Sequence, residues 1–243
     1  MIFIVLPVYN EQNNIGALLR NIDRSMKEYG HGYKVIMVND GSTDNTLQSV
    51  EALKGVVPLL VLSHKKNSGV GEALKTGLVR AVELSEENDV IITMDADNTH
   101  VPGLIMRLNR NIWEGCDVVI ASRFVRDARI LGVPFKRRFL SGAASLLFRF
   151  FFPIRGVKDY TCGFRAYRAG LLQRAFQAHG KELVSESGFS CMIDVLLKLR
   201  KFNPIINEVP IILRYDRRAS GSKMNVQKTI RDTLKLFFQR LGK

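Results

Sequence analysis

Residues 90–100 read VIITMDADNTH, an apolar run that stops at two carboxylates separated by one small residue. In an extended segment alternate side chains point the same way, so Asp95 and Asp97 can face one pocket. The small Ala96 between them lets a ligand lie close to the backbone. Hard oxygen ligands of this kind suit Mg²⁺ or Mn²⁺, which keep open positions for substrate phosphates. The alternative is a polar turn after a buried strand, and the neighbouring sequence has to decide between the two.

Strand-like runs alternate with helical periodicity on the N-terminal side of this stretch. The runs are residues 2–6, which Pro7 ends, 33–38, 56–62 and 90–94, and apolar residues at helical spacing lie between them. Strands and helices in this order predict an α/β fold with a Rossmann-like, mostly parallel sheet and helices on both faces. Such sheets bind ligands at the carboxyl ends of their strands, where Tyr9, Asp40 and Asp95 all fall.

Composition indicates a single globular domain. The 243 residues are 46% hydrophobic, which is enough to bury one large core. Three cysteines, Cys116, Cys162 and Cys191, lie far apart without a Cys-x-x-Cys pair, so the pattern suggests neither a zinc site nor a disulfide framework. A reducing, cytoplasmic setting fits this cysteine pattern. Met1 runs directly into a strand-like segment without a basic leader, which argues against secretion.

Charge is distributed unevenly along the chain. Residues 1–100 contain 9 Lys and Arg against 13 Asp and Glu, a net charge of −4, and residues 101–243 contain the remaining 27 and 10, a net charge of +17. The second half therefore suits an anionic partner, with nucleic acid, an anionic membrane surface and a phosphorylated lipid as candidates. A nucleic-acid-binding protein would account for the overall +13 but not for the acidic strand ends, so we expect no nucleic acid.

Four motifs in the first half resemble those of the family 2 glycosyltransferases. They are PVYNE (7–11), NDGSTD (39–44), NSGVG (67–71) and DAD (95–97), in the family's order. The resemblance covers residues 1–125 and implies a GT-A fold that binds a nucleotide sugar there. The positions that it carries over as the nucleotide-sugar site are Pro7, Tyr9, Glu11, Asp40, Asn67, Gly71, Asp95 and Ala96.

The same resemblance implies that Asp40 contacts the nucleotide and that Asp95 and Asp97 hold Mg²⁺ or Mn²⁺ on the donor diphosphate. Thr99 is the predicted third metal ligand, although Asn98-Thr99 replaces the Leu-Gln or Leu-Ser of many relatives. An architectural role remains the alternative for Pro7 and Asn67, as does a helix-capping role for Asp40.

The second half narrows the resemblance to the polyprenyl-phosphate branch, typified by dolichyl-phosphate mannosyltransferases. The segments concerned are ASRF (121–124), KRRFLS (136–141), DYTCGFR (159–165) and RRASGSK (217–223). The resemblance implies that phosphates are gripped by Arg123, by Arg137 with Ser141, and by Arg217 and Lys223 on a glycine-containing loop. Independently, Arg137 and Ser141 are four residues apart on one helix face, so they can converge on one acceptor phosphate.

Two further segments are predicted to be amphipathic helices at a membrane interface. Residues 139–152 contain Leu140, Leu146, Leu147, Phe148, Phe150 and Phe151, and residues 226–241 combine apolar and basic positions. The first is too short to span a bilayer, which needs about 20 apolar residues, and a core helix is its alternative. We therefore expect a nucleotide-sugar half (1–125), an acceptor half (126–225) and a basic C-terminal helix (226–243), attached peripherally or through a membrane-anchoring partner protein.

The resemblance implies inverting, metal-dependent transfer of a sugar, predicted to be mannose from GDP-mannose, to dolichyl or undecaprenyl phosphate at the cytoplasmic membrane face. A lipid phosphate is ionised near neutral pH, so no strong general base is needed. The resemblance carries the catalytic role over to Asp97, Arg123, Arg217 and Lys223, which would neutralise charge. The alternatives are a UDP-sugar donor carrying glucose or N-acetylhexosamine, and a saccharide hydroxyl acceptor, which would need Asp194 or Glu186 as base. For His100 we favour a hydrogen bond within the loop over a role as base.

Overall fold

The computed structural model describes residues 1–217 and 225–241, without the side chains of Lys136, Arg137 and Arg217. Its strands are β1 (Ile2–Val8), β2 (Tyr33–Asn39), β3 (Leu59–Ser63), β4 (Val90–Thr93), β5 (Val118–Ser122), β6 (Arg129–Leu131), β7 (Arg165–Arg168), β8 (Ile206–Pro210) and β9 (Ile212–Arg214). Its α-helices are α1 (Ile15–Glu28), α2 (Thr46–Glu51), α3 (Val70–Leu84), α4 (Leu104–Trp113), α5 (Phe135–Phe151), α6 (Ala169–His179), α7 (Cys191–Leu199) and α8 (Val226–Leu241). Short 3-10 turns cover Gly180–Leu183, Arg200–Phe202 and Tyr215–Arg217.

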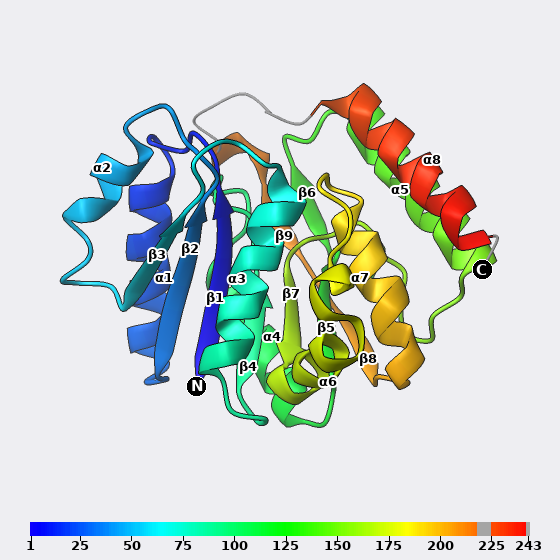
Figure 1. Cartoon of the computed structure of the whole chain (residues 1–243), viewed down its shortest axis with the longest axis horizontal. Helices are drawn as coiled ribbons and strands as arrows, with labels where there is room; N and C mark the ends of the chain where they lie inside the picture. The colour runs from blue at the N-terminus through cyan, green and yellow to red at the C-terminus, as the bar shows by residue number, and fades with distance from the viewer. Residues whose placement is uncertain (218–224, 242–243) are drawn as a thin grey trace.

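Seven strands form the main sheet, in the order β3-β2-β1-β4-β7-β5-β8. All neighbours are parallel except β7, which runs antiparallel between β4 and β5, so the sheet is mostly parallel as predicted. Helices α3 and α6 cover one face and α1 and α4 the other (Figure 1). Strands β6 and β9 form a separate parallel pair. The carboxyl ends of β1, β2 and β4 therefore meet at one edge of the molecule.

Strand β1 runs through Pro7 rather than ending before it, which corrects the predicted boundary. The carbonyl of Val8 accepts a hydrogen bond from Asp40 on the β2 side, whereas that of Val5 accepts one from Met94 on the β4 side. This alternation directs the missing N–H of Pro7 towards β4, whose pairing with β1 has already ended at Val5. Proline therefore costs the sheet no ladder hydrogen bond at this position.

Strand β3 begins at Leu59, later than the predicted 56–62, because Val56 and Val57 donate their N–H groups to the carbonyl of Leu53 and close the preceding turn. Helix α1 follows the predicted periodicity. Its buried apolar side chains recur at helical spacing and pack on the sheet: Ile15, Leu18, Leu19, Ile22 and Met26.

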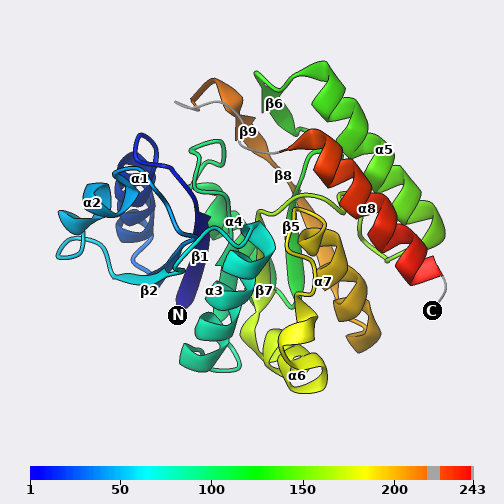
Figure 2. The ribbon, with the colours of Figure 1, turned by 45° about the horizontal axis from the view of Figure 1, so that its top comes forward.

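Helices α5 and α8 lie side by side at one corner of the molecule (Figure 2). Phe148, predicted on the membrane-facing side of α5, is instead fully buried, with its ring against those of Phe152, Tyr160 and Phe237. The alternative prediction, that this segment is a core helix, is thus correct in part, because α5 has one buried face. Its other face exposes large apolar side chains, namely Phe135, Phe139, Leu146, Phe150 and Phe151. No α-helix within the described ranges combines the length and hydrophobicity needed to cross a bilayer.

Candidate active site

Two cavities adjoin at the carboxyl edge of the sheet. One, of about 310 Å³, lies over the ends of β1, β2 and β4, and we call it the donor cavity. The other, of about 510 Å³, lies between α5, α8 and the loop after β5, and we call it the acceptor cavity. Asp95, Phe189 and Thr229 line both. Ligands in the two cavities would therefore meet at these three side chains.

The donor cavity collects nearly all of the residues predicted to bind a nucleotide sugar. Its lining includes Pro7, Tyr9, Glu11, Asp40, Asn67, Asp95 and Ala96. Gly71 lies outside that lining, beneath the segment around Ser187, whose carbonyl accepts its N–H at 2.8 Å. A Cβ at Gly71 would lie 1.8 Å from the carbonyl oxygen of Glu186. Only glycine permits this approach, so Gly71 shapes the cavity wall from behind.

Asp40 holds the loop that follows β3. Its carboxylate accepts hydrogen bonds from the N–H groups of Ser68, at 2.9 Å, and Gly69, at 2.8 Å. The Nδ1 atom of His64 lies 2.7 Å from the same carboxylate, and Nε2 lies 2.9 Å from the hydroxyl of Thr76. Asp40 is thus the fixed centre of this wall, not a helix cap. The His64 contact, which links the ends of β2 and β3 to helix α3, was not predicted from the sequence.

The carboxylates of the DAD motif sit in different surroundings. Asp97 is buried, and its Oδ1 accepts hydrogen bonds from the hydroxyl of Thr99, at 2.6 Å, and from the Thr99 N–H, at 3.1 Å. Asn98 adopts a φ of 62°, which turns the chain between them, and its amide donates to the carbonyl of Asn14. Asp95 is more open, with 40% of its side chain exposed. The loop therefore presents two carboxylates to the donor cavity from a well-anchored backbone.

His100 supports this loop through a hydrogen bond. Its Nδ1 accepts the N–H of Asp95 at 3.1 Å, which requires the proton of a neutral imidazole to be on Nε2. Nε2 lies 3.8 Å from a carboxylate oxygen of Asp95, and the ring stacks on Phe164. The predicted hydrogen bond within the loop is confirmed.

The DAD motif fits a divalent metal by its chemistry. Two carboxylates at one cavity are hard oxygen donors, and a site of this kind leaves positions for diphosphate oxygens and water. No group of three His, Cys, Asp or Glu side chains converges within residues 1–217 and 225–241. The hydroxyl of Thr99 donates a hydrogen bond to Asp97, and Thr99 lines the acceptor cavity. Its role as third metal ligand stays a prediction.

Arg123 lies at the polar end of the acceptor cavity and forms a paired contact with Asp159. Its Nε and Nη2 atoms lie 2.8 and 2.6 Å from the two carboxylate oxygens, and Nη2 also donates to the hydroxyl of Thr161. Burial by itself would lower the pKa of the Arg123 guanidinium, but the charge of Asp159 outweighs it and raises that pKa. Burial likewise would raise the pKa of Asp159, and Arg123 lowers it. Both groups are therefore charged at neutral pH.

Ser141 lines the acceptor cavity beside Arg123, and its hydroxyl lies 2.9 Å from that of Thr161. Arg137 is one helical turn earlier on α5, but its side chain lies outside the described residues. Arg217 ends the 3-10 turn Tyr215–Arg217, its side chain likewise undescribed, and Lys223 falls outside the described ranges. The rest of the lining is largely apolar, including Leu140, Ala144, Leu147, Ile193, Leu213, Ile230 and Leu234.

Asp194, one of the two alternative bases, is fully buried and occupied by ionic contacts. Its carboxylate binds the ammonium of Lys198 at 2.6 Å and the guanidinium of Arg240 at 2.5 Å, and it accepts the hydroxyl of Ser185. Neither Asp194 nor Glu186 lines either cavity. Asp194 therefore has a structural role, because its contact with Arg240 joins the last turn of α8 to α7. Since neither candidate base lines a cavity, the arrangement does not favour a hydroxyl acceptor.

Phe189 and the α8 residues Lys228 and Thr229 line the donor cavity, and sequence reasoning missed all three. Phe189 lies five residues before Asp194, in a Ser-Gly-Phe-Ser context that could have marked it as a loop residue near the site. Thr229 and Lys228 sit in the first turn of a helix predicted only as a membrane element. Their place in the cavity follows from how α8 packs, which local sequence does not indicate.

A comparison of the sequence with known families gives a result that agrees with the fold, the strand-end carboxylates and the paired cavities. The family model described as glycosyl transferase family 2 matches residues 3–176. The chain belongs to this family. Its architecture is the GT-A fold.

Similar proteins extend the family assignment. The chain is 31% identical over 237 residues to a dolichol-phosphate mannosyltransferase of Pyrococcus furiosus, covering 97% of this chain but 62% of that protein. It is 28% identical to a polyprenol monophosphomannose synthase of Mycolicibacterium smegmatis, covering 91% and 80%. A glucosyl-3-phosphoglycerate synthase of Mycobacterium tuberculosis, solved with Mn²⁺ and UDP-glucose, superposes with a TM-score of 0.65 at 18% identity, covering 100% and 78%. At that identity the likeness concerns the fold.

Proposed function

We propose that this glycosyltransferase moves mannose from GDP-mannose to a polyprenyl phosphate such as dolichyl or undecaprenyl phosphate. The observation that carries the proposal is the pair of adjoining cavities, one lined by carboxylates and one largely apolar with Arg123 and Ser141 at its polar end. Relatives named for dolichol-phosphate, polyprenol and undecaprenyl-phosphate mannose transfer support the same acceptor class.

The donor would occupy the cavity over β1, β2 and β4, with its nucleotide beside Asp40 and its diphosphate near Asp95 and Asp97. When bound there, Mg²⁺ or Mn²⁺ would neutralise charge on the departing diphosphate. Asp97 is prepared for this role because Thr99 fixes its carboxylate. The loop that Asp40 holds by hydrogen bonds would form the wall against the base or ribose of the nucleotide.

The acceptor would place its phosphate beside Arg123 and Ser141 and its lipid chain along the apolar part of the acceptor cavity. Arg123 is oriented by its two bonds to Asp159, and its contact with Thr161 brings it next to Ser141 at the cavity. Arg137 would join them from α5, and Arg217 and Lys223 would reach the phosphates from the segment between β9 and α8.

The reaction needs positioning and charge neutralisation more than a base. An oxygen of the ionised lipid phosphate attacks the anomeric carbon from the side opposite the diphosphate, so the configuration inverts. The bond from that carbon to the diphosphate oxygen breaks, and its electron pair leaves with the nucleoside diphosphate. Arginine donors stabilise the phosphate charges throughout this exchange.

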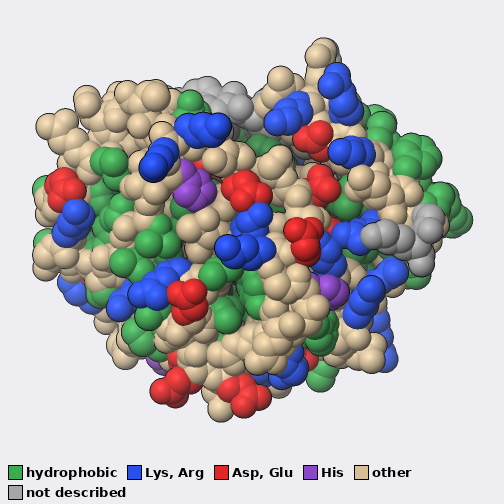
Figure 3. All heavy atoms as spheres, viewed as in Figure 1, with side chains coloured by type: hydrophobic (Ala, Val, Ile, Leu, Met, Phe, Trp, Pro, Cys, Tyr) green, Lys and Arg blue, Asp and Glu red, His purple; other side chains and the backbone are tan. Residues whose placement is uncertain are grey.

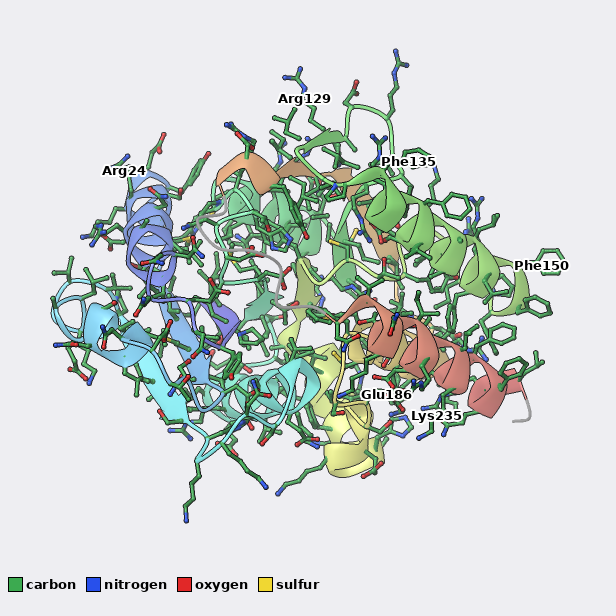
Figure 4. The ribbon with its side chains drawn as sticks, turned by 90° about the horizontal axis from the view of Figure 1, so that it is seen from above. Arg24, Arg129, Phe135, Phe150, Glu186 and Lys235 are labelled. Atoms are coloured by element: carbon green, nitrogen blue, oxygen red, sulfur yellow. The ribbon has the colours of Figure 1, made fainter. Side chains whose placement is uncertain are left out.

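Helices α5 and α8 would rest on the anionic cytoplasmic face of a membrane. Phe135 and Phe150, 80% and 78% exposed, point away from the body of the protein on α5 (Figure 4), and Phe238 is exposed on α8. Hydrophobic side chains gather at the corner formed by these helices (Figure 3). These exposed apolar residues belong to the strongly basic second half of the chain. Binding at a membrane interface combines apolar insertion with the attraction of basic residues to anionic lipids. A lipid drawn into the acceptor cavity would then enter from this side.

The deciding assay offers radiolabelled GDP-mannose, UDP-glucose and UDP-N-acetylglucosamine separately, each with polyprenyl phosphate in mixed micelles. We expect label in the lipid fraction with GDP-mannose and none without polyprenyl phosphate. Label with a UDP-sugar alone would replace the donor and keep the acceptor, which is the alternative that the sequence left open. Label on added oligosaccharide, but not on lipid, would refute the acceptor.

A further inference from the structure

The junction between the two cavities is walled by a small set of side chains. Asp95 comes from the DAD motif, Phe189 from the segment before α7, and Thr229 from the first turn of α8. A donor diphosphate in one cavity and an acceptor phosphate in the other would bracket this junction. The transferred sugar is the part of both donor and product that has to lie there.

The segment that carries Phe189 is held in place from both sides. The carbonyl of Ser187 accepts the N–H of Gly71, and a Cβ at Gly69 would lie 2.6 Å from that same oxygen. On the other side the carbonyl of Phe189 accepts the N–H of Met192 at the start of α7. Phe189 is 36% exposed and lines both cavities, so it stands at the junction on a fixed backbone and does not pack in the core.

Thr229 reaches the same place from a helix with its own anchor. The Thr229 hydroxyl donates to the carbonyl of Asn225 at 2.9 Å, which leaves its oxygen lone pairs to accept a further hydrogen bond. At the far end of α8, Arg240 binds Asp194. The helix is thereby fixed relative to α7, which begins at Cys191, two residues after Phe189 in the same wall.

From this geometry we infer that Phe189 and Thr229 contact the transferred sugar, which rests on the proposed function and deepens it. The ring of Phe189 covers the apolar C–H face of the sugar and keeps water from the anomeric carbon. The hydroxyl of Thr229 accepts a hydrogen bond from a sugar hydroxyl and so contributes to the choice of sugar.

Water is the competing acceptor at this junction. In transfer, a phosphate oxygen bonds to the anomeric carbon while the bond to the diphosphate breaks with its electron pair on the diphosphate. In hydrolysis, the oxygen of water bonds to the anomeric carbon instead, and one proton of that water passes to solvent. The bond to the diphosphate breaks as it does in transfer. A side chain that excludes water therefore sets the ratio of the two products.

The test measures lipid-linked sugar and free sugar in parallel for the wild type and for Phe189→Ala. We expect the ratio of hydrolysis to transfer to rise by about three- to ten-fold in the variant, the effect of losing one aromatic contact. Phe189→Leu keeps an apolar side chain without the ring face and should show a smaller rise in the ratio of hydrolysis to transfer. If the alanine variant does not fold, the leucine variant tests the inference. Tyr29→Ala, an exposed aromatic residue outside both cavity linings, is the control and should leave the ratio unchanged.

An unchanged ratio in both Phe189 variants, with the wild type active, would overturn the inference and leave the proposed function standing. A wild type that makes no lipid-linked sugar from any donor would overturn the proposed function and the inference with it. For Thr229→Val, which keeps the shape of the side chain, we expect weaker discrimination between GDP-mannose and GDP-glucose, by about three-fold or more. Unchanged discrimination would remove Thr229 from the sugar site.

Discussion

The donor and acceptor cavities lie side by side but are built in different ways. The donor cavity is formed by loops at strand ends, held by backbone hydrogen bonds to Asp40 and by close glycine contacts such as that of Gly71. The acceptor cavity is formed by α5, α8 and the loop after β5, and we expect it to depend on the largely buried ion pair of Arg123 with Asp159. Changes in the first should therefore impair chemistry with little effect on stability, whereas changes in the second should affect both.

The largest expected effect is on the donor side. Asp97→Asn should lower transfer by about 1,000-fold, because the proposed metal site loses a charged ligand, and should leave the thermal unfolding temperature nearly unchanged. Steady-state rates and a melting curve of the same preparation measure the two quantities. Glu114→Gln, an exposed carboxylate at the end of α4, is the control. Full activity of Asp97→Asn, or of the wild type in EDTA, would refute the metal site.

The second effect is on the stability of the acceptor side. Asp159→Asn leaves the largely buried Arg123 without its charge partner and should lower the free energy of unfolding by about 3 to 5 kcal/mol. Because Arg123 lowers the pKa of Asp159 in the folded state, this contribution is present above the unfolded value of about 4 and is lost as the pH falls through the folded value.

Urea unfolding at pH 7 and pH 3 measures this difference, which should narrow at the lower pH. Glu51→Gln, which removes an exposed pair with Lys54, should cost less than about 1 kcal/mol at either pH. A loss in Asp159→Asn as small as that of the control would mean that the ion pair does not hold the acceptor side together.

A third, smaller effect separates the substrates. Arg137→Ala should lower kcat/KM for polyprenyl phosphate by about 10- to 100-fold, the effect of one charge-assisted hydrogen bond, and leave the KM for the nucleotide sugar unchanged. Each substrate is varied separately at saturation of the other. Impaired donor affinity with normal acceptor kinetics would move Arg137 out of the acceptor site.

The smallest effect concerns the exposed face of α5. Phe150→Asp should weaken binding to anionic vesicles by about ten-fold without unfolding the protein, because the side chain is exposed. Sedimentation with vesicles at low and high salt measures the binding, and Ile205→Asp, at an exposed position just before β8, is the control. Equal binding by both variants would exclude this face as the membrane contact.

The polar strand ends could be predicted because strand direction and side-chain alternation are local properties of the sequence. Tyr9, Asp40 and Asp95 all line the donor cavity as expected. Antiparallel strand β7 could not be predicted, since its four residues contain two arginines and carry no strand periodicity. Phe189 and Thr229 were not predicted either, because their place depends on how distant elements pack. The prediction for Phe148 was wrong since an apolar run does not say which side of a helix faces the core.

Helix α8 supplies residues to both cavities and is tied to α7 by Arg240. A ligand that contacts this helix in one cavity stabilises a wall of the other, and thermodynamic linkage makes the effect reciprocal. Binding of donor and acceptor should therefore be cooperative, and the backbone amides of α8 should exchange more slowly with deuterated solvent when either substrate is bound. We therefore expect the arrival of either substrate to raise the affinity of the protein for the other through this one helix.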